Sequence, residues 1–373
     1  MLTCIIRIAA AVTGALLLAG CSSTLDPARS EAPIGFSAGS ALLRDDAPPT
    51  KFGQAIEGTS FQSGSSFLLY GRRNTDPLLF SAREVSLSGS LWEYENPEQW
   101  NWTSDSDYYD FLALYLGDLH DAGRLTNPLP SCNTDNPLSV SVAYDPSQEQ
   151  YDLMLAGKRR TYDAPEGRTA TVHLTFLHML SAVKLRIANV SDASSLTFTG
   201  YHFENLVSRG TASVTATYDG EGNASYAWTG LTRLATAVGG TANLSTEALN
   251  ALGTAGFLPH ALSPGENQGN HSYLDLMIPQ RLDEKIGIDG WPALVLEYTP
   301  TGESATSARI LLKDIYTDPA PGQEPAAISK WEMGKQYLYE IELSLDGGVQ
   351  VHVTTSDWDS VPAETPGLLL PEL

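Results

Sequence analysis

The sequence predicts an all-β protein with two domains, and three observations support this. Apolar and polar residues alternate over many short segments, which is the period of strands buried on one face. Turn-forming residues separate these segments, and the chain of 373 residues holds 32 Gly and 22 Pro. The best helix pattern covers only residues 246–252, with Ser245 as its N-cap. A chain of this length has room for two domains of ordinary size.

The first segment, residues 1–21, is a targeting sequence and is set aside from the fold. Arg7 precedes an apolar run over residues 8–19, which is too short to span a membrane. The run ends in Leu-Ala-Gly-Cys at Cys21, which looks like a bacterial lipoprotein signal and implies that a lipid is attached to the Cys21 thiol. An ordinary secretory signal is the alternative. Residues 22–33 are polar and contain proline, so we expect a tether.

The predicted N-terminal β domain covers residues 34–157. Its first strand has Ile34, Phe36 and Ala38 at alternate positions, and it ends at Arg44 before a proline pair. Further short strands are predicted at residues 66–70, 80–87, 91–94, 108–116, 138–144 and 151–156. The segment 108–116 is almost continuously apolar, which is typical of a central strand covered on both faces.

A charged segment with proline and glycine, residues 158–168, is the predicted linker between the domains. The C-terminal β domain covers residues 169–358 and opens with a strand over residues 172–189. The apolar positions of this strand change parity near Ser181, which we interpret as a β-bulge. Later strands are predicted at residues 196–206, 212–218, 225–231, 273–278, 293–298 and 307–315, with a hairpin over residues 337–353. Residues 359–373 form a C-terminal tail.

His178 shares the parity of the apolar face in the first half of the strand 172–189. The pattern therefore turns its ring toward a core, where each ring nitrogen needs a hydrogen-bond partner. A metal or catalytic role is the alternative, but no second His, Cys or carboxylate lies at ligand spacing. We expect a structural role for His178.

Composition and motifs point away from nucleic-acid binding and catalysis. The 44 Asp and Glu residues against 22 Lys and Arg give a formal charge of −22, opposite to the charge that phosphate binding needs. No phosphate loop, zinc motif or nucleophile elbow occurs, so we predict no enzyme and no catalytic, cofactor-binding or metal site. Asp105, Asp107 and Asp110 suit a solvated loop better than a glycosidase pair. Cys132 has no partner for an internal disulfide.

Trp92, Trp100 and Trp102 lie close together in the sequence. Aromatic rings stack on sugars, so one interpretation is a glycan-binding face. Packing within a β domain is the commoner role of such residues. A lipid-anchored carbohydrate-binding protein therefore stays open as the alternative function.

Several segments in order resemble the fimbrillin family, the pilin-like lipoproteins of type V pili. The resemblance covers nearly the whole chain after the targeting segment. The matching segments are the one ending at Cys21, residues 34–36 ahead of Arg44, 67–71, 92–94 with Trp100, 108–116, 151–156, 176–182, and 333–339 leading to Trp358.

The resemblance implies two transthyretin-like β-sandwich domains and assembly by strand exchange at the outer membrane. In that family an Arg-specific protease cuts near the first strand, the strand is lost, and a strand from another subunit fills the groove. Carried onto this sequence, Arg44 is the cleavage site, residues 34–43 are the leaving strand, and the tail with Leu368, Leu369 and Leu370 is the donor. A member that keeps its first strand would act as an anchor, a tip or a separate surface lipoprotein.

The resemblance therefore implies a non-enzymatic structural or adhesive subunit of cell-surface fimbriae. Its implied partners are other fimbrial subunits, the Arg-specific protease, and outer-membrane lipid reached through Cys21. No cofactor is implied.

Overall fold

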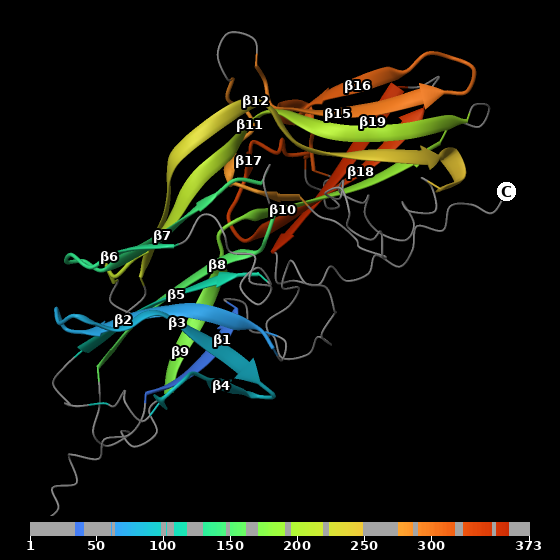
Figure 1. Cartoon of the computed structure of the whole chain (residues 1–373). Helices are drawn as coiled ribbons and strands as arrows, with labels where there is room; N and C mark the ends of the chain where they lie inside the picture. The colour runs from blue at the N-terminus through green and yellow to red at the C-terminus, as the bar shows by residue number, and fades with distance from the viewer. Residues whose placement is uncertain are drawn as a thin grey trace, which may run out of the picture.

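The computed structural model shows an almost entirely β protein, which confirms the predicted all-β, sandwich-type fold (Figure 1). The targeting segment, the tether and the C-terminal tail all lie outside the described residues. The structure describes residues 34–40, 61, 64–97, 102, 108–117, 130–146, 150–161, 171–190, 195–218, 224–248, 275–285, 290–317, 324–344 and 348–357.

The first sheet has seven strands in the order β1-β9-β8-β5-β2-β3-β4. Strand β5 lies in its middle, and every residue of β5 after the first is buried. This confirms the central strand that the apolar segment 108–116 predicted. The strands are β1 (Gly35–Ser40), β2 (Ser66–Arg73), β3 (Leu78–Ser88), β4 (Leu91–Glu93), β5 (Tyr108–Leu116), β8 (Leu153–Thr161) and β9 (Thr171–His178).

The two faces of the seven-stranded sheet pack against different cores. One face carries an aromatic core that includes Phe36, Phe80, Phe111 and Phe176. The two ends of the sheet approach each other around this core. The hydroxyl of Tyr94, directly after β4, donates a 2.7 Å hydrogen bond to the carbonyl of Ile34, directly before β1. The opposite face packs aliphatic side chains against strands of the six-stranded sheet.

A long hairpin joins two halves of the molecule, one that holds the seven-stranded sheet and one that holds the four-stranded sheet. It consists of β11 (Leu196–Thr215) and β12 (Ser225–Ser245). The first half of β11 pairs with β15 (Ala293–Pro300), and its second half pairs with β7 (Ser139–Tyr144). The six-stranded sheet is completed by β6 (Ser131–Asn133) and β16 (Thr306–Leu311). Figure 1 shows β11 and β12 running side by side from one half to the other.

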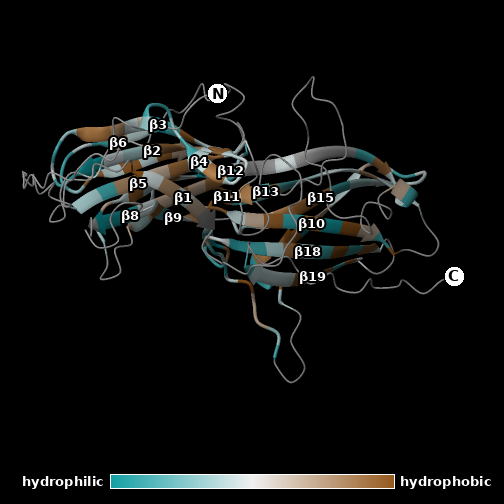
Figure 2. Ribbon diagram, turned by 90° about the horizontal axis from the view of Figure 1, so that it is seen from below, coloured by the Kyte–Doolittle hydropathy of each residue, from teal (hydrophilic) through white to brown (hydrophobic). Residues whose placement is uncertain are grey.

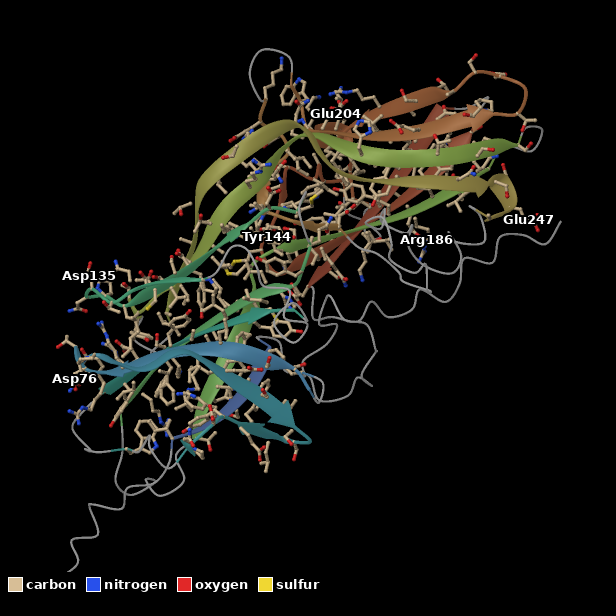
Figure 3. The ribbon with its side chains drawn as sticks, viewed as in Figure 1. Asp76, Asp135, Tyr144, Arg186, Glu204 and Glu247 are labelled. Atoms are coloured by element: carbon tan, nitrogen blue, oxygen red, sulfur yellow. The ribbon has the colours of Figure 1, made fainter. Side chains whose placement is uncertain are left out.

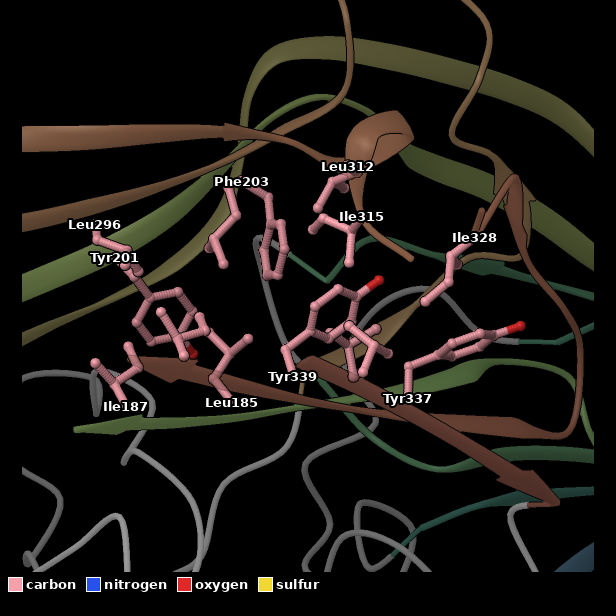
Figure 4. Packing of buried hydrophobic residues seen from close by; sticks show 14 of the residues in the cluster. Leu185, Ile187, Tyr201, Phe203, Leu296, Leu312, Ile315, Ile328, Tyr337 and Tyr339 are labelled. Atoms are coloured by element: carbon pink, nitrogen blue, oxygen red, sulfur yellow. The ribbon is translucent and has the colours of Figure 1, made fainter. Parts of the chain in front are cut away.

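The four-stranded sheet covers the first half of this hairpin and has the order β13-β10-β18-β19. Hydrophobic and hydrophilic residues alternate along β10 and β18 (Figure 2). Leu185 and Tyr339 of this sheet face Tyr201, Phe203 and Leu296 of the other one (Figure 4). The strands are β10 (Ser181–Asn189), β13 (Asp275–Met277), β18 (Lys335–Ser344) and β19 (Gly348–Asp357).

Two smaller elements complete the described chain. A short pair of strands, β14 (Gln280–Arg281) and β17 (Lys330–Trp331), lies beside a 3-10 turn at Leu312–Asp314. The predicted hairpin at the C-terminal end is confirmed, because β18 and β19 pair from Lys335 with Asp357 to Ser344 with Gly348.

The helix expected over residues 246–252 is described only at 246–248. The Ser245 hydroxyl accepts a 3.3 Å hydrogen bond from the Ala248 amide, as expected of an N-cap.

The strand predicted over residues 172–189 is two strands in two sheets. Strand β9 belongs to the seven-stranded sheet and β10 to the four-stranded one, so the change of parity near Ser181 marks a crossing and not a bulge. The Met179 amide donates to the Leu153 carbonyl at 2.8 Å, and the Leu180 carbonyl accepts from the Gly334 amide at 2.9 Å. A change of side-chain parity alone does not separate these two cases.

The crossing also moves the division between the sheets away from the predicted linker. Strand β8 continues through Lys158 to Thr161 and pairs with β5 along its whole length. Strand β9 then pairs with β8 and β1, so the first sheet extends to His178. The charged residues that suggested a linker, Lys158 to Arg160, are partly buried residues near the end of β8, and residues 162–168 lie outside the described part.

The close approach of β12 to β11 depends on Gly239, which pairs with His202. A Cβ atom at position 239 would lie 2.3 Å from the Tyr201 carbonyl oxygen, and backbone cannot yield as a side chain does. We expect Gly239→Ala to lower the free energy of unfolding by about 1–3 kcal/mol in chemical denaturation. Gly35→Ala is the matched control, because its Cβ would meet only Thr171 Oγ1 at 3.5 Å. Equal stability of the two variants would contradict the close contact.

Candidate functional site

Strand β1 is an edge strand, and among the described strands its backbone pairs with a neighbouring strand on one side only. It runs parallel to β9, with the pairs extending from Gly35 opposite Thr171 to Ser40 opposite Phe176. The Ser37 hydroxyl lies 2.9 Å from His173 Nδ1, which adds one side-chain contact on the outer face. An edge strand of this kind can be replaced by another strand without breaking the rest of the sheet.

Alternate side chains of β1 enter the aromatic core. Ile34 is 1% exposed and Phe36 is 5% exposed. The Phe36 ring lies 5.8 Å from Phe80, 5.7 Å from Tyr94 and 5.4 Å from Phe111, each in an edge-to-face arrangement. Such pairs contribute roughly 0.5–1.5 kcal/mol each beyond burial. We call Phe80, Tyr94 and Phe111 the aromatic cage.

Gly71 of β2 lies close to two rings of the cage. A Cβ atom there would lie 3.0 Å from both the Phe80 and the Phe111 ring. Glycine at this position is what allows the two rings to lie at their present separation of 6.2 Å. The third ring, Tyr94, also carries the hydroxyl that donates to the Ile34 carbonyl.

These contacts define the β1 groove: the edge of β9 from Thr171 to Phe176 together with the aromatic cage. If β1 left, the backbone groups on this edge of β9 would lose their strand partner, and the cage would lose the ring at its centre. The burial of Ile34 and of Phe36 contributes about 1.5–3 kcal/mol each. Arg44, the predicted cleavage position, lies in residues 41–60, outside the described part of the chain.

A second group of buried polar residues lies where the two sheets meet. His178 is 3% exposed, and its Nδ1 lies 2.8 Å from Oδ1 of Asp152, which is fully buried. This places the ring in a core, as the parity of the strand indicated, and its structural role stays a prediction. The sequence did not identify Asp152 as the partner, because it lies on another strand segment.

Asp275 lies close by and connects the two halves through hydrogen bonds. We call Asp275 and its two donors, Tyr201 and Gln150, the Asp275 clamp. The Asp275 carboxylate accepts hydrogen bonds from the Tyr201 hydroxyl at 2.8 Å and from Gln150 Nε2 at 3.1 Å. Tyr144, which Figure 3 labels near the middle of the molecule, donates to the Leu276 carbonyl at 2.8 Å. Burial, with a contribution from the Asp275 charge, raises the pKa of Tyr144 and of Tyr201 well above the usual value. Both hydroxyls therefore stay protonated and act as donors.

Sequence reasoning missed this clamp. Its one available signal was that Asp275 shares the parity of the apolar Tyr273 and Met277 in the strand predicted over residues 273–278. A carboxylate on an apolar face requires buried donors, but the donors come from segments more than seventy residues away in the chain.

The tryptophans of the alternative interpretation lie in the aromatic core where they are described. Trp102 is 2% exposed and packs 4.6 Å from Tyr109. Trp92 is partly buried and packs against Phe61 and Phe67. Trp100 lies outside the described residues. An enclosed ring such as Trp102 presents no face on which a sugar could stack, so the structure does not favour a glycan-binding platform there.

Asp110 differs from its expected place in a solvated loop. It is fully buried in β5, and its two oxygens accept hydrogen bonds from Arg159 at 2.8 and 3.0 Å. The Arg159 guanidinium also lies 4.0 Å from the centre of the Tyr108 ring. The hydrogen bond to Asp110 raises the pKa of Arg159. The expectation failed because one charged residue inside an apolar segment is compatible with a buried ion pair. Asp105 and Asp107 lie outside the described residues.

Cys132 is a partly buried residue of β6, and burial raises the pKa of its thiol. Within the described ranges, no group of three His, Cys, Asp or Glu side chains is arranged to hold a metal ion. No helix in that same part of the chain is long and apolar enough to cross a membrane.

The fold and the β1 groove define an all-β, sandwich-type protein with an N-terminal edge strand set in an aromatic core. The chain belongs to the fimbrillin-like family, whose model matches residues 55–358. This confirms the resemblance that its ordered segments indicated.

Two solved structures show what the chain is similar to. A fimbrial protein from Bacteroides vulgatus has 14% identity and a TM-score of 0.43, with 78% of this chain and 92% of that chain covered. The tip fimbrial protein Mfa3 from Porphyromonas gingivalis has 9% identity and a TM-score of 0.32, with 80% of this chain and 95% of that chain covered. Comparison with curated proteins found no match.

The buried pair of His178 and Asp152 generates a stability prediction. We expect His178→Ala to lower the free energy of unfolding by about 1–3 kcal/mol, because a buried carboxylate loses a hydrogen-bond partner. Thermal and urea denaturation measure the change. His173→Ala is the matched control, since that ring contacts Ser37 on the exposed face. An unchanged melting temperature for His178→Ala would show that the pair is not structural.

Proposed function

We propose that the protein is a non-enzymatic structural and adhesive subunit of cell-surface fimbriae and that it assembles by exchange of β1. Membership of the fimbrillin-like family supports the fimbrial role. The observation that carries the exchange step is the position of β1, a six-residue parallel edge strand that places Phe36 in the aromatic cage. Its partners are then other fimbrial subunits.

The chemistry of exchange follows from the β1 groove. A cut after Arg44 by an Arg-specific protease separates β1 from the rest of the chain, so that only non-covalent contacts retain it. Loss of β1 leaves an open strand edge and an apolar cage, both unfavourable in water. An incoming strand restores both by β-augmentation. On this proposal, the tail with Leu368, Leu369 and Leu370 is the segment that this subunit offers to another groove.

Location follows from the N-terminal segment. Lipid attached to Cys21 anchors the subunit precursor in the outer membrane, and residues 22–33 hold its domains away from the surface. A lipid anchor with two membrane-binding signals is strong enough to retain a protein stably at a membrane.

Strand exchange is tested by cleavage and peptide uptake. After treatment with an Arg-specific protease, N-terminal sequencing is expected to show a new terminus at Asp45. The cut protein is then expected to take up a fluorescent peptide of residues 33–43, measured by anisotropy. Arg44→Lys is the matched control, because it keeps the charge but is not cut, and it is expected to exclude the peptide. Failure of the cut protein to bind the peptide would contradict strand exchange.

Lipid anchoring is tested in a Gram-negative host that processes lipoproteins. We expect Cys21→Ser to abolish incorporation of a labelled fatty acid and to move the protein out of the detergent phase on partitioning. Cys132→Ser, at a cysteine of β6, is the matched control and is expected to remain labelled. Equal labelling of both variants would remove Cys21 as the lipid site.

A further inference from the structure

We propose that the β1 groove selects a donor strand with an aromatic residue at the Phe36 position, and that this donor comes from a different subunit and not from a second copy of this chain. The inference rests on the proposed strand exchange and specifies the partner. Four features carry it: the geometry of the cage, its rigidity, the register of β1, and the composition of this chain's own tail.

The geometry of the cage fits a flat ring. The planes of Phe80, Tyr94 and Phe111 make angles of 84°, 66° and 81° with the plane of Phe36. Edge-to-face contacts of this kind place the hydrogens of one ring against the π-face of another. A branched aliphatic side chain has no such edge or face. Leu at this position would fill part of the volume and lose all three ring contacts.

The cage cannot contract around a smaller side chain. Phe80 and Phe111 are fully buried, and a Cβ atom at position 71 would lie 3.0 Å from each of them, so the space between Gly71 and the two rings is small. Tyr94 lies 5.6 Å from Phe80 in a further edge-to-face contact, so the rings hold one another in place. Close-packed interiors relax only partly around a deleted group, so a smaller donor residue leaves a void.

The alternation of buried and partly exposed residues along β1 defines the sequence pattern that a donor strand needs. Ile34 and Phe36 are buried, Ala38 packs against the same core, and Ser37 lies on the opposite face beside His173. The matching donor therefore has a large aliphatic residue, an aromatic one and a small one at alternate positions. The hydrogen bond from Tyr94 ends on a backbone carbonyl, so it holds any donor and adds no selectivity.

The tail of this chain does not meet that pattern. Residues 359–373 contain no aromatic residue, and their one strongly apolar run is Leu368 to Leu370, between Pro366 and Pro371. Every six-residue stretch that holds all three leucines includes at least one of these prolines, which lack the amide hydrogen that pairs strands. At best the tail places Leu in the cage. It therefore suits another groove better than that of its own kind.

The experiment uses the full mature chain with one recognition sequence for a sequence-specific protease inserted after Arg44. After cleavage, unlabelled peptides compete with a fluorescent peptide of residues 33–43 for the groove. The competitors are the native sequence, the same peptide with Phe36→Leu, the same peptide with residues 36 and 37 exchanged, and the tail peptide 363–373. The exchanged peptide has the native composition but turns the ring to the wrong face.

We expect the Phe36→Leu and tail peptides to compete at least about tenfold more weakly than the native peptide, which corresponds to about 1.4 kcal/mol. The exchanged peptide is expected to be the weakest. Competition by the leucine or tail peptide at native strength would overturn the selectivity while strand exchange stands, and so would polymer ladders formed by the cut chain alone through its tail. If the native peptide itself does not bind, strand exchange fails and this inference fails with it.

Discussion

Two of the three hydrophobic cores of this protein share one strand, β11, which pairs along its length with β12. Phe198, Tyr201 and Phe203 of β11 lie in the core beneath the four-stranded sheet, whereas Ala212 and Val214 of the same strand lie in the core beneath the seven-stranded sheet. Four register shifts along the pair let it bend between these surroundings. The two halves therefore share a continuous backbone ladder, and the relative position of the halves depends on that ladder.

The junction between the halves is reinforced by polar contacts that only burial makes strong. The chain crosses from one sheet to the other at Met179 and Leu180, directly after the His178 pair with Asp152. The clamp at Asp275 receives donors from both halves, Tyr201 from one and Gln150 from the other. Buried polar groups of this kind specify a single arrangement, because any shift leaves a group unsatisfied. The proposed role of linking neighbouring subunits in a fibre would need such a fixed junction.

Strand β1 has the opposite character. It contributes buried side chains but one backbone ladder among the described strands, and on its other side it meets the ring and the hydroxyl of Tyr94, which follows β4. Its buried side chains complete the N-terminal core, and its single backbone ladder is what the proposed exchange would replace. On the proposed exchange, the aromatic cage that retains Phe36 would also discriminate among its replacements, so that stability of the free subunit and choice of partner would rest on one set of rings.

The sequence by itself determined the all-β class, the burial of His178 and the final hairpin, because side-chain alternation reports which face of a strand is covered. It also determined the central strand β5, because a continuous apolar run indicates a strand covered on both faces. Its ordered segments also determined the family. Only the tertiary structure decided that the segment 172–189 crosses between sheets, that Asp110 is buried with Arg159, and that Trp102 is enclosed. The alternation of apolar and polar residues indicates which side chains are buried, but it does not indicate which strands pack against them. Pairing between distant strands, such as β1 with β9, depends on the fold as a whole.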